Sequence, residues 1–151
     1  MRAVKEIWDH TETVGVLLTE TLGRALGPVL DYKAPEGGCA LGDFVEVPLG
    51  PRKMLGVVWG AAAGGYDAAK LRSVARVLDT PPMRDEMRAF LSRAADYTLT
   101  PLPAMLRLAT RAPGLGDPPS MRRIYRLGSG VPDRATEARG RVIEVLRAFG
   151  G

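Results

Sequence analysis

Four carboxylates lie beside predicted strands, where paired acidic side chains can carry general acid–base chemistry. They are Asp31, Asp43, Glu46 and Asp79. Carboxylates at strand ends are usually solvated and contribute little by themselves. Their position alone therefore gives a hydrolase little support, and we expect no catalytic residue in this chain.

The chain has one cysteine and one histidine for nucleophilic or metal chemistry. Cys39 lies in a glycine-rich turn, whereas His10 lies in a polar N-terminal segment, so a Cys–His pair is not expected. One cysteine excludes an internal disulfide and a multi-cysteine zinc site, and one histidine excludes paired-histidine metal motifs. None of the four lysines follows a glycine, which excludes a Walker-type phosphate loop. We predict no metal site.

Basic side chains gather in clusters at predicted loops and element ends, where phosphates can reach them. Residues 81–151 carry 12 basic and 7 acidic side chains, against 9 and 10 in residues 1–80. A basic half indicates an anionic partner, most commonly nucleic acid, and a solvated arginine-rich surface is the alternative. Asparagine and glutamine, which read adenine, are absent, so we expect recognition of backbone, shape or a strand end. The clusters are Arg52–Lys53, Lys70–Arg72, Arg107–Arg111 and Arg122–Arg126.

The elements that must position these side chains begin with short strands. Glycine and proline, 18 and 12 of 151 residues, predict many turns. Residues 44–48 alternate apolar and polar side chains, and a basic turn joins them to the next run in a hairpin. Residues 14–78 should form a small, strongly bent antiparallel β-sheet or barrel. The predicted strands are residues 14–18, 29–33, 44–48, 54–59 and 71–78.

Helices follow the strands, which gives an α+β fold class. Met83, Met87, Phe90, Leu91 and Ala94 recur at helical spacing and predict one buried stripe. A second short helix is predicted over residues 102–108, with prolines near its start.

The chain divides, by composition, into a tail, a domain, a linker and a second segment. Residues 1–13 are polar and predict a flexible tail, and residues 14–112 form the first domain. The proline- and glycine-rich residues 113–120 predict a linker. Residues 121–127 are basic and can form a strand, and Thr136 can cap a last amphipathic helix. One strand and one helix cannot close a core, so we expect residues 121–151 to be a truncated domain.

Five segments occur in an order and spacing that are continuous from about residue 14 to residue 113. They are residues 29–37 (VLDYKAPEG), 42–50 (GDFVEVPLG), 55–59 (LGVVW), 71–79 (LRSVARVLD) and 94–98 (AADYT). Each is short, and their combination is specific. Together they resemble the N-terminal DNA-binding region of the primosomal replication-restart helicase family, PriA or primosomal protein N′.

The resemblance implies a function for each domain. Residues 14–112 resemble a domain that binds the 3′-hydroxyl end of the nascent leading strand at a stalled fork, without base preference. It thereby positions a replication-restart helicase for primosome assembly. Residues 121–151 resemble the truncated start of a winged-helix DNA-binding domain. The family's ATP-dependent 3′–5′ helicase lobes and zinc-binding cysteines come later, so this fragment should bind DNA without catalysis, ATP or zinc.

The resemblance also implies partners and a location. The expected partners are branched DNA forks with a 3′-hydroxyl end, other primosome proteins and single-stranded DNA-binding protein. The expected location is the bacterial cytoplasm, in association with the nucleoid and without a membrane.

The family's 3′-end pocket carries over to Leu30, Asp31, Gly50 and Arg72. The family has an aromatic residue where Leu30 lies and a lysine where Arg72 lies. A carboxylate accepts a hydroxyl hydrogen bond and repels phosphate, so Asp31 should hold the terminal 3′-hydroxyl. Gly50 should let backbone N–H groups approach the sugar or base, and Arg72 should neutralise the last phosphodiester. Arg52, Lys53, Lys70, Arg122 and Arg123 are the further residues expected to contact the DNA backbone.

Two other functions fit the composition. An RNA-binding β-barrel module would favour structured RNA and ignore a 3′-hydroxyl. A protein-interaction module of the primosome would bind DNA weakly, and salt at physiological concentration would abolish that binding.

Overall fold

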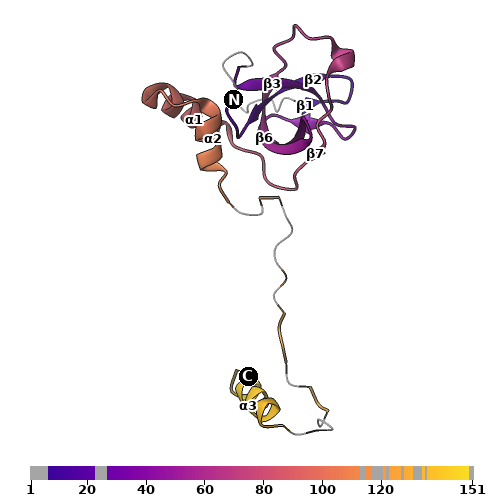
Figure 1. Cartoon of the computed structure of the whole chain (residues 1–151), viewed down its shortest axis with the longest axis vertical. Helices are drawn as coiled ribbons and strands as arrows, with labels where there is room; N and C mark the ends of the chain where they lie inside the picture. The colour runs from indigo at the N-terminus through magenta and orange to yellow at the C-terminus, as the bar shows by residue number, and fades with distance from the viewer. Residues whose placement is uncertain are drawn as a thin grey trace. The chain divides into compact units, whose positions relative to one another are not determined.

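The chain divides into two compact units, Met1–Asp117 and Pro118–Gly151, which are described separately below (Figure 1). The computed structural model describes residues 7–22, 27–112, 115–116, 121, 123–126, 128–130, 134 and 136–149.

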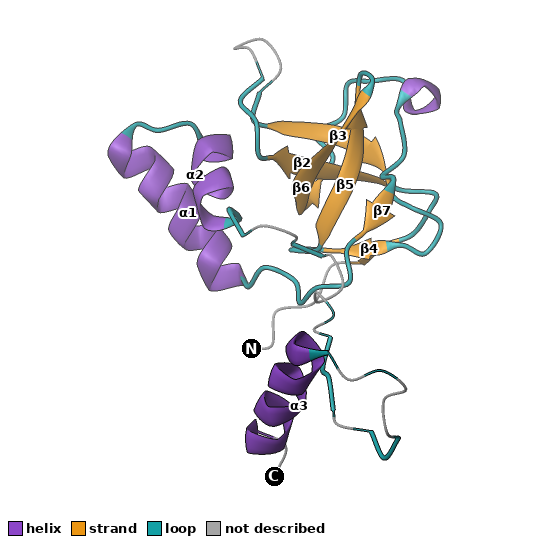
Figure 2. Ribbon diagram, turned by 60° about the horizontal axis from the view of Figure 1, so that its bottom comes forward, coloured by secondary structure: helices purple, strands orange, loops and turns teal. Residues whose placement is uncertain are grey.

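Within the described residues, the first unit is built on an antiparallel sheet of five strands (Figure 2). The strand order is β3–β2–β6–β5–β7, where β7 is Arg76–Val77, and every neighbouring pair is antiparallel. The strands predicted over residues 14–18, 29–33, 44–48 and 54–59 are confirmed to within two residues. Their observed bounds are Thr13–Leu18 for β2, Val29–Lys33 for β3, Phe44–Leu49 for β5 and Arg52–Ala61 for β6.

Strand β2 is buried on both faces, which explains its unbroken apolar run. Successive side chains of a strand point to opposite faces. Val14, Val16 and Leu18 therefore pack into one cluster, whereas Leu17 packs with Val57 of β6 in a second cluster on the other face. The second cluster also contains Leu91 and Leu106 from the helices and Met83 from the segment just before them.

The sheet is bent, but it does not close into a barrel. One isolated parallel bridge pairs Lys33, at the end of β3, with Ser73. Its backbone bonds run from Lys33 N–H to the Arg72 carbonyl at 3.0 Å and from Val74 N–H to the Lys33 carbonyl at 2.9 Å. The α+β class with a bent antiparallel sheet is thus confirmed, and the alternative of a barrel is wrong.

The strand predicted over residues 71–78 is much shorter than expected. Only Arg76–Val77 forms a strand, β7, which pairs with β5. The segment first bonds β3 at Ser73 and then reaches β5, where Ala75 N–H donates to the Glu46 carbonyl at 2.8 Å. Because the segment crosses from β3 to β5, it forms no long ladder with either strand.

Two helices follow and lie side by side next to the sheet (Figure 2). They are α1, Asp85–Thr98, and α2, Leu102–Ala109, which confirms the helix predicted over residues 102–108. Leu106 of α2 is fully buried in the cluster against β2. The helices therefore cover one face of the sheet.

The predicted buried stripe of α1 is wrong at two positions. The helix buries Leu91 and Ala95, whereas Met87 and Phe90 are 45 % and 63 % exposed. Arg88 takes the inner position instead, with its guanidinium 5.9 Å from the Trp59 ring centroid. A long arginine stem can cover apolar surface, so the apolar pattern alone places the wrong side of the helix inward.

The predicted flexible tail is wrong for residues 7–13. Ile7–Trp8 forms β1, which pairs antiparallel with β4, Cys39–Ala40. Trp8 is buried in the core, and tryptophan buries a large apolar area. This burial holds the start of the described chain on the domain, and residues 1–6 lie outside the described residues.

The second unit contains helix α3, Glu137–Phe149, as predicted. Thr136 caps it, because its hydroxyl accepts the Arg139 N–H at 3.4 Å and its carbonyl accepts the Gly140 N–H at 2.9 Å. The strand suggested over residues 121–127 is not formed at residues 123–126. Most of the predicted linker, residues 113–120, lies outside the described residues, and the winged-helix domain stays a prediction.

Among the described helices, none is long and apolar enough to cross a membrane.

Candidate nucleic-acid interface

A cavity of about 720 Å³, named here the Asp31 pocket, opens beside the edge strand β3. Three segments line it: residues 27–32 around β3, residues 48–50 at the end of β5 and the start of the β5–β6 turn, and the loop that follows β6. The structure brings Leu30, Asp31, Gly50 and Arg72 together in this one pocket, with Lys70 beside them. These residues are far apart in the sequence, and the bend of the sheet gathers them.

Asp31 lies on β3 and holds the loop after β6. Its Oδ1 accepts the Ala63 N–H at 2.9 Å, and its Oδ2 accepts the Gly64 N–H at 2.9 Å. A carboxylate has about four acceptor positions, so each oxygen can accept a further hydrogen bond. Asp31 is therefore both a structural tether and an available acceptor in the pocket.

Gly50 lies in the tight turn between β5 and β6, where its φ is +59°. A Cβ at this position would meet no protein atom within 4 Å. The glycine is therefore required by its left-handed backbone conformation and not by lack of space in the protein. The Gly50 carbonyl accepts a hydrogen bond from Arg72 Nη1 at 3.0 Å.

Two cationic side chains give the pocket its positive charge. Arg72 is exposed and is oriented by its bond to the Gly50 carbonyl. Lys70 is exposed at the end of the short 3₁₀ helix η1, Ala68–Lys70. Among the described residues, neither cation forms an ion pair, so both charges are available to an anionic ligand.

Two tyrosines line the pocket in different ways. Tyr32 is buried, and its hydroxyl donates to the Pro48 carbonyl at 3.3 Å. Burial raises the pKa of the Tyr32 hydroxyl, and the nearby Arg72 charge opposes that rise in part. Tyr66 is instead 66 % exposed on the loop after β6. Sequence reasoning missed Tyr66, although an aromatic residue in a loop of glycine and alanine was a signal.

The other predicted DNA-contacting residues lie outside this pocket. Arg52 and Lys53 are exposed at the start of β6, two and three residues after Gly50. Arg123 is exposed in the second unit, and Arg122 lies outside the described residues.

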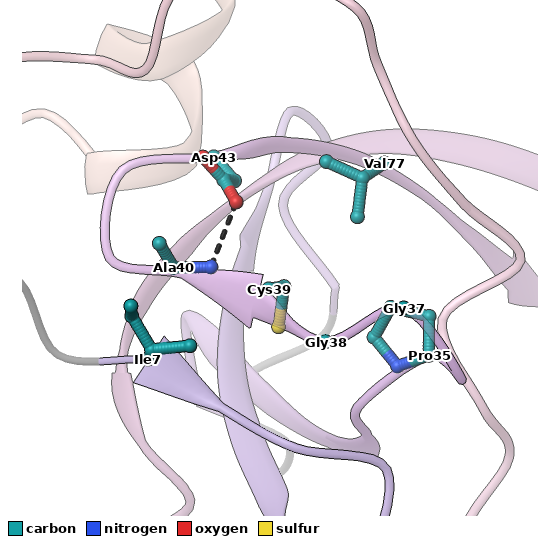
Figure 3. A pocket seen from close by; sticks show the side chains of 8 residues that line it. All are labelled: Ile7, Pro35, Gly37, Gly38, Cys39, Ala40, Asp43 and Val77. Carbon is teal, nitrogen blue, oxygen red and sulfur yellow. Dashed lines mark hydrogen bonds between the residues drawn. The ribbon is translucent and has the colours of Figure 1, made fainter.

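A second cavity of about 490 Å³, named here the Cys39 hollow, lies beside β1 and β4 (Figure 3). Asp43 Oδ2 accepts the Ala40 N–H there at 2.7 Å. Burial, with the Asp43 and Glu12 charges, raises the pKa of the Cys39 thiol to about 11, which keeps it protonated. No group of three or more possible metal ligands occurs among the residues the structure describes. The buried, protonated thiol of Cys39 is therefore a poor nucleophile.

Residues 16–111 match the family model described as the 3′DNA-binding domain (3′BD) of PriA. The match covers more than half of the chain and spans the sheet, the Asp31 pocket and both helices of the first unit. Residues 16–111 therefore form a DNA-binding domain. The chain belongs to the PriA 3′DNA-binding domain family, which confirms the resemblance to the N-terminal region of PriA. No curated protein matches the chain.

Proposed function

We propose that the Asp31 pocket binds the 3′-hydroxyl end of a DNA strand. One observation carries the proposal. A single pocket of about 720 Å³ is lined by the half-buried carboxylate of Asp31 and by two cations, Lys70 and Arg72. Neither cation forms an ion pair among the described residues. Pockets of about 300–1,000 Å³ suit a ligand the size of a nucleotide. The membership in the 3′DNA-binding domain family supports DNA as that ligand.

The charges suit a hydroxyl end better than a phosphorylated end. A 3′-hydroxyl donates a hydrogen bond that the Asp31 carboxylate can accept, whereas a 3′-phosphate would be repelled by it. Arg72 and Lys70 attract the phosphodiester that precedes the terminal sugar. Arg52 and Lys53, exposed beside the β5–β6 turn, extend this attraction along the strand.

The rest of the lining supports binding without base preference. Leu30, Leu49 and Leu71 provide apolar walls, and Gly50 exposes backbone. Sequence readout relies on side-chain donors and acceptors matched to base edges, for which asparagine and glutamine are the adenine readers. Their absence from the chain favours an end-binding role at any sequence.

The family match also supports a wider role. We propose that this module holds the nascent leading-strand end at a stalled fork and positions a replication-restart helicase for primosome assembly. In this proposal, the second unit is the start of a winged-helix domain, and Arg122 and Arg123 contact the DNA backbone. Forked DNA, other primosome proteins and single-stranded DNA-binding protein are the proposed partners, in the bacterial cytoplasm and nucleoid.

The test compares three matched forks at one fixed, moderate salt concentration. The leading strand ends at the junction in a 3′-hydroxyl, ends in a 3′-phosphate, or is missing. We expect the 151-residue chain to bind the hydroxyl end about tenfold more tightly than the phosphate end, as one charge-assisted hydrogen bond allows. Equal binding to all three forks would rule out the end-binding pocket and leave only attraction to phosphates.

The choice of variant follows from the two hydrogen bonds of Asp31. Asp31→Ala would also release the loop held at Ala63 and Gly64, so Asp31→Asn, which keeps one acceptor oxygen, is the sharper change. We expect Asp31→Asn to lose the preference for hydroxyl over phosphate. Asp43→Asn is the matched control, because that carboxylate also accepts a backbone N–H but lies in the Cys39 hollow. It should keep the preference.

Two additions to these titrations separate the alternative functions. A structured RNA is added as a competitor, and an RNA that displaces the labelled hydroxyl fork as well as the unlabelled fork does would favour the RNA-binding module. Binding that disappears at physiological salt for every fork would favour a protein-interaction module.

A further inference from the structure

We infer that Gly64 is a positioning residue of the Asp31 pocket: its backbone conformation fixes the orientation of the carboxylate that is proposed to accept the terminal 3′-hydroxyl. This inference rests on the proposed function of that pocket. It adds a second requirement for reading a strand end, because the carboxylate must be held in one orientation as well as be present.

The first argument is the pair of hydrogen bonds between Asp31 and the loop after β6. Asp31 Oδ1 accepts the Ala63 N–H and Oδ2 accepts the Gly64 N–H, each at 2.9 Å. Two consecutive N–H groups thus bond the two oxygens of one carboxylate, so a rotation of the carboxylate would break at least one bond. Ala63 and Gly64 are both exposed, and water would otherwise bond their N–H groups. Burial therefore does not explain the arrangement.

The second argument is the backbone conformation that directs these N–H groups. Gly64 has φ +79°, and the following Gly65 has φ +93°. Residues with a Cβ disfavour such angles, whereas glycine adopts them readily. A Cβ at Gly64 would meet no described protein atom within 4 Å, so lack of space does not require glycine here. What the glycine supplies is the positive φ, which lets successive N–H groups face Asp31.

Gly64 acts through Asp31 and not on the ligand. The described residues that line the pocket include Ala63, whereas Gly64 and Gly65 lie outside the lining. A hydrogen bond is directional, so a 3′-hydroxyl needs a carboxylate oxygen at a set position. Coulomb repulsion depends on the distance between two charges, so rejection of a 3′-phosphate needs only the negative charge. Loosening the carboxylate should therefore impair hydroxyl recognition more than phosphate rejection.

The test compares three ends on the same fork: a 3′-hydroxyl, a 2′,3′-dideoxy end and a 3′-phosphate. The dideoxy end lacks only the terminal hydroxyl, so it isolates the hydrogen bond. The 151-residue chain should bind the hydroxyl end about tenfold more tightly than the dideoxy end. Gly64→Ala should reduce this preference to about twofold, because binding must then immobilise the freed Asp31 side chain. The same variant should keep most of the discrimination between the dideoxy and phosphate ends.

Two further variants separate the backbone conformation from the added side chain. Gly60→Ala places the same methyl group near the end of β6, where a Cβ also meets no described atom within 4 Å and φ is not positive. It should keep the tenfold preference. Gly64→Asn adds a larger side chain, but asparagine adopts positive φ more readily than alanine. It should retain more of the hydroxyl preference than Gly64→Ala. Circular dichroism checks that each variant is folded.

Hydrogen exchange followed by NMR measures the tether directly. The N–H groups of residues 63 and 64 should exchange about tenfold faster in Gly64→Ala than in the parent chain, because their bonds to Asp31 open more often. In Gly60→Ala both exchange rates should match those of the parent chain.

The outcomes distinguish this inference from the proposed function. Faster exchange and a lost hydroxyl preference in Gly64→Ala, with neither change in Gly60→Ala, would support both. If the parent chain prefers the hydroxyl end and Gly64→Ala retains the full preference, the end pocket stands and the positioning role is wrong. The positioning role is also wrong if Gly60→Ala loses the preference as strongly as Gly64→Ala. If the parent chain binds the hydroxyl and dideoxy ends equally, the proposed function is wrong and the positioning role falls with it.

Discussion

The Asp31 pocket and the Cys39 hollow lie on the same domain and use a carboxylate in a similar way. Asp31 accepts two backbone N–H groups of a loop, and Asp43 accepts the Ala40 N–H beside β4. Their surroundings differ. The larger pocket adds Lys70, Arg72 and an exposed aromatic ring, whereas the described residues that line the hollow include a protonated thiol and no cationic side chain.

The difference separates a carboxylate that shapes a turn from one that we propose also binds a ligand. Bonds to backbone N–H groups shape a turn in both places, so such bonds alone do not indicate a ligand. The additional cations and the ring are the features that suit a DNA end.

The largest effect should come from replacing one glycine near each cavity, Gly42 beside the Cys39 hollow and Gly50 in the Asp31 pocket. Gly42, next to Asp43, has φ +87°, and an added Cβ would press on the Met83 carbonyl oxygen. Gly42→Ala should therefore lower the free energy of unfolding by about 3 kcal/mol, from backbone strain and overpacking together. Gly50→Ala adds strain without a clash and should cost about 1 kcal/mol. Urea unfolding followed by circular dichroism measures both, and similar losses would contradict the contrast.

The next effect concerns the reactivity of the Cys39 thiol. Its pKa of about 11 leaves very little thiolate near pH 8, and the side chain is buried. Each pKa unit lowers the thiolate fraction about tenfold, so the native thiol should react about 100-fold more slowly with iodoacetamide than the thiol of the urea-unfolded chain. Mass spectrometry of timed samples gives both rates. Equal rates would show that the hollow opens to solvent and contains a reactive thiol.

Much of the sheet could be predicted from the sequence, because strand periodicity is a local signal. Residues 44–48 alternate and form β5, and the unbroken run at residues 14–18 forms the doubly buried β2. The two-residue strand β1 is too short to show a period, so the sequence pattern predicts that Trp8 lies in a tail. On α1, Arg88 occupies an inner position through its contact with Trp59, which apolar spacing cannot reveal.

The candidate site was less predictable from the sequence than the sheet was. The residue types of Asp31, Gly50 and Arg72 became informative only through the family resemblance, since no spacing rule joins them. Their gathering in one pocket depends on the bend of the sheet and on the Lys33–Ser73 bridge. Tyr66 lies on an irregular loop, where no periodicity states which way a side chain faces, and only the structure places it in the lining.

A charge reversal at Arg72 tests the cationic side of the comparison. Arg72→Glu places a second acidic group in the Asp31 pocket and should weaken binding to the hydroxyl fork by about 30-fold. Arg93→Glu is the matched control, because it changes the net charge equally from an exposed position on α1 outside the pocket. It should weaken binding by less than about threefold. Fluorescence anisotropy at fixed salt measures both, and equal losses would mean that net charge alone attracts the DNA.

The smallest effect concerns an ion pair that should have no part in either cavity. Arg76 on β7 donates to both carboxylate oxygens of Glu46 on β5, at 3.0 and 3.2 Å, and this hydrogen bonding lowers the pKa of Glu46. Because the folded-state pKa lies below the unfolded value, the pair stabilises the fold above pH 4.5, and this contribution falls as the pH drops through the folded pKa. Both side chains are partly exposed, so Glu46→Gln should cost only about 0.5 kcal/mol at pH 7. Unfolding in urea should show this difference shrinking on acidification, while the hydroxyl preference at pH 7 stays unchanged. A variant that altered that preference would show that β5 and β7 also shape the Asp31 pocket, and the division between structural and binding carboxylates would not hold.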